Sequence, residues 1–261
     1  MNQKIVVLLA TAAMTVSLAC NAMAAFVQGD LIRVVYDTVG TKEYATDLGS
    51  WSTLTADAIT GNVTVGGGGD AILLSTLGAG SWNNLVVGYY LTDATSGANR
   101  VATAGAAGGV TSANRKFTSY NGAAGLVTTN YNATAAGATS VLLNDKTSGN
   151  TYYTKLDTNG ATIGEYSGWF SPTNNPGGSL SLAPLATTGY VDQTIYRWSA
   201  ANLGLQGPTA GAAAFTVRTM ADGSTVINSY ATPEPSTYAL LCISLGVVGF
   251  ARKKLGKKAD F

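Results

Sequence analysis

Short runs of β-branched and aromatic residues, separated by breaks of Gly, Asn, Asp and Ser, constrain the fold of this chain most. Such alternation is typical of strands joined by turns. It predicts strands at 26–36, 84–91, 151–156 and 190–198. The runs 214–219 and 224–227 flank the residues MADG, which favours a closing hairpin with Gly223 at positive φ.

About ten short strands in one chain predict a mainly β fold, a β-sandwich or jelly-roll-like domain. We expect one or two short helices, at 69–78 and 140–146. Segments 92–114 and 121–139 are rich in Gly, Ala, Thr and Asn, so we expect long loops there.

The N-terminus has the composition of a secretory signal peptide. Lys4 precedes an apolar run, and the small-residue site Ala22-Met23-Ala24 follows it. We therefore assign 1–24 as a signal helix and 25–231 as the exported β domain. A permanent transmembrane anchor and lipoprotein processing at Cys20 are the alternatives.

The C-terminal segment combines three different parts. Pro233 and Pro235 hold the backbone extended around Glu234. Residues 236–251 carry no charge, and as a helix they would span about 24 Å, short of a hydrocarbon core of about 30 Å. The cations that follow favour a cytoplasmic C-terminus: Arg252, Lys253, Lys254, Lys257 and Lys258. We expect a short transmembrane helix at 236–251, with a helix packed in the soluble core as the alternative.

The residues TPEPSTYALLCISLGVVGFARKK resemble the PEP-CTERM sorting signal of Gram-negative, exopolysaccharide-producing bacteria, although Thr232 stands where that family often has valine. The resemblance covers 232–258, with the motif at Pro233, Glu234 and Pro235 and the basic tail at 252–258. It implies that an exosortase processes the chain and that the helix crosses the inner membrane transiently. It also implies sorting to the cell surface or the extracellular matrix of a biofilm.

Composition excludes several kinds of chemistry in the exported domain. The chain has no histidine, and its cysteines, Cys20 and Cys242, both lie in the terminal apolar segments. A Ser-His-Asp triad and a histidine-ligated zinc site are therefore excluded. The domain has nine Lys/Arg and twelve Asp/Glu, a net charge of −3, which argues against nucleic-acid binding.

Few residues point to catalysis, and we expect no enzyme, cofactor or metal site. Asp37, Glu43, Asp47 and Glu165 are the carboxylates that glycosidase chemistry would need, with solvated turn positions as the alternative. The stretch GGGGD at 66–70 lacks the Gly-Lys-Ser/Thr ending of a phosphate-binding loop, so we interpret it as a flexible loop.

Aromatic residues point to one candidate ligand, exopolysaccharide. Trp169 and Phe170 in the stretch 167–178, together with Trp198, form the candidate glycan contact, and core packing is the alternative. The sequence thus predicts a non-enzymatic, exosortase-processed surface or matrix protein. A carbohydrate-binding module is the first alternative, and a carboxylate-dependent glycosidase or an ice-binding protein is less favoured.

Overall fold

The computed structural model describes residues 26–61, 63–65, 74–93, 100–105, 115–157, 179–199, 205–206 and 211–229. The chain divides into two units, Met1–Ser229 and Tyr230–Phe261, and every described residue belongs to the first. The predicted signal helix at 1–24 and sorting signal at 232–258 lie outside the described residues.

Ten strands form one antiparallel sheet in the order β3-β12-β11-β9-β5-β4-β1-β2-β7, and β8 pairs with β4 off this path. β4 uses its first half for β8 and its second half for β5. The strands of this sheet are β1 (Asp30–Asp37), β2 (Glu43–Ser50), β3 (Val63–Val65), β4 (Leu85–Asp93), β5 (Arg100–Gly105), β7 (Ser140–Leu143), β8 (Ser179–Ser181), β9 (Tyr190–Ser199), β11 (Ala212–Met220) and β12 (Thr225–Ser229). A second, two-stranded sheet pairs β6 (Arg115–Lys116) with β10 (Leu205–Gln206).

This sheet folds over on itself. Neighbouring strands lie about 4.8 Å apart, so a flat sheet would separate β1 from β12 by about 24 Å. Yet the side chain of Arg33 on β1 donates a hydrogen bond of 2.6 Å to Thr225 on β12. The strands β1, β2 and β4 therefore form one layer, and β9, β11 and β12 form a second layer that faces it.

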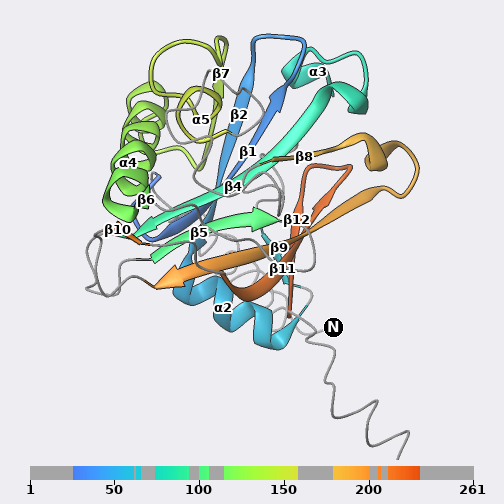
Figure 1. The fold of residues 1–261 in the computed structure, drawn as a ribbon. Coiled ribbons are helices and arrows are strands. Elements are labelled where there is room, and N and C mark those ends of the chain that lie inside the picture. Colours follow the sequence, from blue (N-terminus) through green and yellow to red (C-terminus); the bar gives the residue numbers. More distant parts are fainter. Residues whose placement is uncertain are drawn as a thin grey trace, which may run out of the picture. The chain divides into compact units, whose positions relative to one another are not determined.

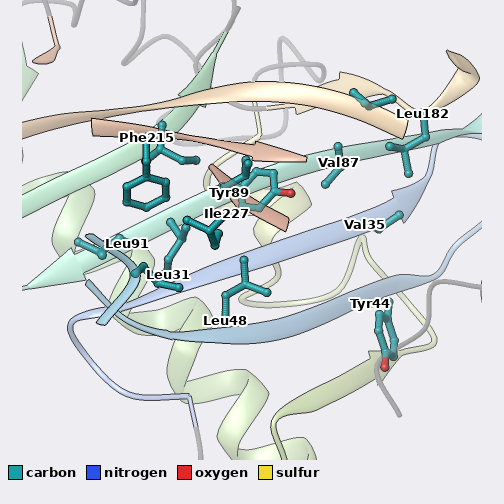
Figure 2. Packing of buried hydrophobic residues seen from close by; sticks show 14 of the residues in the cluster. Leu31, Val35, Tyr44, Leu48, Val87, Tyr89, Leu91, Leu182, Phe215 and Ile227 are labelled. Atoms are coloured by element: carbon teal, nitrogen blue, oxygen red, sulfur yellow. The ribbon is translucent and has the colours of Figure 1, made fainter. Parts of the chain in front are cut away.

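Apolar side chains fill the space between these layers, and we call them the interlayer cluster. Figure 2 shows members from β1, β2 and β4 beside Phe215 of β11 and Ile227 of β12. The labelled members are Leu31, Val35, Tyr44, Leu48, Val87, Tyr89, Leu91, Leu182, Phe215 and Ile227. Each is less than a tenth exposed, so this cluster is one core of the domain.

A second core, the helix-side cluster, covers the opposite face of β1, β2 and β4. Ile32, Val34 and Tyr36 alternate along β1 with the residues of the interlayer cluster, because successive side chains of a strand point to opposite faces. Helix α4 (Phe117–Thr134) and the single turn α5 (Tyr152–Lys155) lie against this face (Figure 1).

The other helices are shorter than α4. Helix α2 (Trp51–Thr60) begins at Ser50, whose hydroxyl caps the amide of Thr53, and ends at Gly61, which has φ 74°. It packs Trp51 and Leu54 into the interlayer cluster and contacts β12 (Figure 1). The remaining turns are α3 (Leu74–Leu77) and the 3₁₀ segments η1 (Trp82–Asn84) and η2 (Ala183–Ala186).

The mainly β class predicted from the sequence is confirmed, although the two layers belong to one hydrogen-bonded sheet. The strands expected at 26–36, 84–91 and 190–198 are present as β1, β4 and β9. The closing hairpin is β11–β12, and Gly223 has φ 86°.

Several local predictions were wrong. The loop expected at 121–139 is largely the helix α4, and β5 lies inside the loop expected at 92–114. The strand expected at 151–156 is the helical turn α5, and the helix expected at 140–146 is the strand β7. Within the described residues the helices are therefore more numerous than the one or two expected.

Candidate functional site

A buried carboxyl group connects the sheet to both covering helices. Glu43 begins β2 and is 0 % exposed. Its Oε1 accepts a hydrogen bond of 2.6 Å from the Tyr131 hydroxyl on α4 and one of 3.0 Å from the Tyr152 amide. Its Oε2 accepts a hydrogen bond of 2.9 Å from the Tyr153 amide, so Glu43 caps the first turn of α5.

The surroundings of Glu43 change its acidity. Burial raises the pKa of Glu43 from 4.5 to about 7, because the charged form loses water. The hydrogen bonds from Tyr131, Tyr153 and Tyr152 lower this pKa, and the charge of Asp157 adds to the rise. Because the pKa of Glu43 rises overall, the loss of water has a larger effect on it than the three hydrogen bonds.

A buried lysine lies in the same region, after β7. The Lys146 amine donates to the main-chain oxygen of Asp37 and, at 2.6 Å, to that of Gly40. It also lies 4.8 Å from the centre of the Tyr153 ring and 5.6 Å from that of Tyr36. Burial lowers the pKa of Lys146, while the charges of Asp37, Glu43 and Asp157 raise it in part. Lys146 thereby fixes the turn between β1 and β2.

A third buried group joins two distant parts of the chain. Asp157 is 0 % exposed and accepts a hydrogen bond of 3.0 Å from the Ser179 hydroxyl. It also accepts a hydrogen bond from the Tyr36 hydroxyl on β1. Asp157 and Ser179 therefore meet beside Tyr36 on β1.

A separate polar contact lies between the layers. Arg33 on β1 is 0 % exposed and donates to the Gly223 carbonyl at 2.6 Å and to the Thr46 hydroxyl at 3.1 Å, in addition to Thr225. Beside it, the hydroxyls of Tyr89 and Thr219 hydrogen-bond at 2.7 Å. These contacts attach the closing hairpin to the first layer.

Of the candidate glycan contacts, Trp198 lies within the described residues. Trp198 is 4 % exposed and belongs to the helix-side cluster. Its indole lies so close to Gly211 that a side chain there would clash with it. Its indole is therefore packed in the core, the alternative that the sequence left open. Trp169 and Phe170 lie outside the described residues, so the carbohydrate-binding prediction stays a prediction.

Three of the four carboxylates considered for glycosidase chemistry are buried rather than solvated. Asp37 is 4 % exposed, Glu43 0 % and Asp47 7 %. The charges of Asp37 and Glu43 both raise the pKa of Lys146. Asp47 hydrogen-bonds to Asp30 and accepts a hydrogen bond of 2.7 Å from the amide of Gly49. These three groups make contacts that hold parts of the fold together. Glu165 lies outside the described residues.

Sequence reasoning missed Lys146, Asp157, Arg33 and Tyr131. One signal was available for Arg33, because a single cation inside the apolar run LIRVVY indicates a buried charge with dedicated partners. Lys146 and Asp157 stand in turn-like sequences that give no such signal. Among the described residues, no group of three or more His, Cys, Asp or Glu side chains is arranged to hold a metal ion.

The fold and these contacts define the class of the molecule: a mainly β domain with two apolar cores and buried polar anchors, followed by a separate C-terminal unit. Residues 231–254 of that unit match the family described as PEP-CTERM protein-sorting motif, so the chain carries this sorting motif. No curated protein and no solved structure matches the chain.

The match confirms the resemblance that the sequence suggested. It contains Pro233, Glu234 and Pro235 and the first three cations of the basic tail, while Lys257 and Lys258 follow it. In the part of the chain that the structure describes, no helix is both long and apolar enough to cross a membrane. The transmembrane helix predicted for 236–251 lies outside that part.

Proposed function

We propose that this chain is an exported, non-enzymatic protein of the cell surface or extracellular matrix, which an exosortase processes near Pro233-Glu234-Pro235. The match of residues 231–254 to the PEP-CTERM protein-sorting motif carries the proposal. The predicted signal peptide at 1–24 supports export, because a sorting signal acts on a chain that has already entered the secretory route.

The physical properties of the tail agree with a transient anchor. The two prolines would keep the backbone around Glu234 extended, which is the conformation that a processing enzyme can bind along its main chain. An uncharged helix of about 24 Å would span the membrane only with local thinning, at a modest energetic cost. The cations after it would keep the C-terminus in the cytoplasm, so cleavage near the motif would free the folded domain on the other side.

The folded domain is suited to being the part of the chain that remains outside the cell after processing. Its interior is closed by contacts between distant segments, such as Arg33 with Thr225 and Asp157 with Ser179. It has no cysteine, so its stability does not depend on disulfide formation after export. Because the tail resembles a sorting signal of exopolysaccharide-producing bacteria, we propose that the mature domain associates with the exopolysaccharide of a biofilm.

The processing experiment measures the intact mass of the mature chain from hosts with and without an exosortase. We expect loss of the tail only in the host that has the enzyme. The variant Glu234→Gln should keep the full C-terminus there, while Glu165→Gln, a glutamate outside the motif, should be processed normally. An unchanged C-terminus in both hosts would reject the sorting proposal.

A further inference from the structure

The first described residue, Phe26, is part of the core, although it follows the predicted signal peptide almost directly. Its side chain is 1 % exposed and belongs to the helix-side cluster. The centre of its ring lies 5.2 Å from that of Tyr131 on α4. Removal of residues 1–24 would leave Ala25 as the new amino terminus, so a single peptide bond would separate a charged group from this buried phenylalanine.

The side chain of Asn132, in the last turn of α4, holds the main chain at this place. Its Nδ2 donates a hydrogen bond of 2.6 Å to the carbonyl oxygen of Phe26. Because a carbonyl oxygen only accepts, this contact fixes which side-chain atom of Asn132 faces Phe26. Among the described residues, the other atom, Oδ1, is buried and has no hydrogen-bond donor. Buried polar atoms in folded proteins normally have a partner, so Oδ1 is an acceptor in need of one.

The end of α4 at which Asn132 lies favours a positive charge. The last carbonyl groups of a helix carry a partial negative charge, and a cation close to them is stabilising. Helix α4 has 18 residues, and none of those in its last turn is basic. The helix itself therefore does not supply the cation that its C-terminal end would attract.

We propose that the mature amino terminus binds at this place, with its ammonium group donating to Oδ1 of Asn132. This inference rests on the proposed export of the chain and on cleavage of the Ala24–Ala25 bond by a signal peptidase. Hydrolysis of that bond consumes one water molecule and leaves a carboxylate on Ala24 and an ammonium group on Ala25. Consecutive Cα atoms are about 3.8 Å apart, so this ammonium stays within about 7 Å of the Phe26 carbonyl oxygen that Asn132 already binds.

Removal of the signal peptide thereby stabilises the fold only after export. In the precursor, position 25 carries an uncharged peptide N–H, so no cation is available for Asn132 and the end of α4. A hydrogen bond from a charged donor contributes more to stability than one between neutral groups. The precursor is therefore less stable than the mature domain, which favours an unfolded chain during export.

The first measurement is the mass of the N-terminal peptide of the chain exported by a host that has a signal peptidase. We expect this peptide to begin at Ala25. A mature chain that starts at any other residue would overturn this inference, and a chain that keeps its signal peptide would overturn the proposed export as well. Processing at 233–235 changes the other end of the chain, so its failure is measured separately.

The second measurement is a double-mutant cycle on the chain from Ala25 to Phe261. Mild acetylation near pH 7 blocks the amino terminus in preference to lysine, because their ordinary pKa values are about 7.7–8.0 and about 10.4. In the unchanged chain, we expect acetylation to lower the folding equilibrium constant, measured by urea unfolding, by about tenfold. In Asn132→Ala the acceptor is absent, so the same acetylation should lower it by less than about twofold. Asn130→Ala, on the same helix, is the matched control and should keep the full effect.

An equal effect of acetylation in Asn132→Ala and in the unchanged chain would overturn the proposal. Should this variant fail to fold, nitrogen NMR of the unchanged chain decides. Acetylation that shifts the side-chain amide signals of Asn132, and leaves those of Asn130 in place, supports the contact. Asn132 signals that do not respond to acetylation contradict it.

Discussion

Arg33 joins the two layers of the sheet by side-chain hydrogen bonds. Its guanidinium reaches Gly223 and Thr225, which are 190 and 192 residues away, and also Thr46 on the neighbouring strand. All of these contacts are buried, so each acceptor would lose its donor without access to water if the arginine were removed.

We predict that Arg33→Met destabilises the domain by about 3 kcal/mol, because buried acceptors lose charged donors while the apolar contacts are mostly kept. Arg218→Met is the matched control. Arg218 bonds Asp192 at 2.7 Å, but both side chains are more than a third exposed, so its loss should cost about 0.5 kcal/mol. Urea unfolding measures both values, and equal effects would contradict the special role of Arg33.

The sequence could indicate that Arg33 is buried, but it could not identify its partners. A cation between Ile32 and Val34 in an apolar strand needs polar acceptors inside the fold. Which residues supply them depends on how the sheet folds over, and this brings together positions at opposite ends of the domain. The same limit applies to Glu43, whose partners come from two helices that the sequence did not predict.

At the scale of elements, α4 shows why composition misled the prediction. Its Gly, Thr and Asn residues have low helix propensity, which made 121–139 resemble a loop. The helix signal was the spacing of Tyr120, Ala124, Val127 and Tyr131, all of which are buried on one face. Packing of this face, rather than propensity, stabilises α4.

The turn α5 is a similar case. The sequence TYYTKL alternates like a strand, yet Thr151 and Thr154 form a reciprocal capping box and Glu43 satisfies the first amides of the turn. The tertiary contact from Glu43 cannot be read from the local sequence. By contrast, the hairpin β11–β12 is specified locally by its turn residues, and it was predicted correctly.

A test of this view of α4 replaces one of its glycines. Gly122 is exposed in the helix, and a methyl group there would meet no atom within 4 Å. We predict that Gly122→Ala raises the free energy of unfolding by about 0.5–1 kcal/mol, because alanine loses less backbone freedom on folding.

Gly149→Ala is the control, since Gly149 is also exposed and its added methyl group would also meet nothing within 4 Å. Its φ of +62° strains an alanine, so this variant should lose stability. Thermal unfolding of both variants gives the comparison. A loss of stability in Gly122→Ala would show that α4 is not helical at that position in solution.

At the scale of the whole molecule, the sequence predicted the class but not the connectivity. Alternating runs and turn residues suffice to indicate a mainly β domain. The pairing of β12 with β3, and of β5 with β9, joins segments that are distant along the chain, and no local pattern specifies such a choice. The sorting motif lies at the opposite extreme, because its three parts follow one another directly and could be recognised in order.

The two units of the chain lead to a prediction about its boundary. In the described structure, members of the two apolar clusters extend from Phe26 to Ile227, and β12 ends at Ser229. We therefore expect residues 26–229 to fold without the tail, with the same cooperative unfolding transition as the full domain.

Truncation a few residues earlier should have the opposite effect. A chain that ends at Met220 lacks β12, which pairs with both β11 and β3 and supplies Thr225 as an acceptor for Arg33. It also loses Ile227 from the interlayer cluster, where the side chain is 0 % exposed. Near-ultraviolet circular dichroism and urea unfolding compare the two truncated chains. Cooperative unfolding of residues 26–220 would show that the closing hairpin is not needed to complete the second layer. Failure of residues 26–229 to fold would show that part of the core lies beyond Ser229.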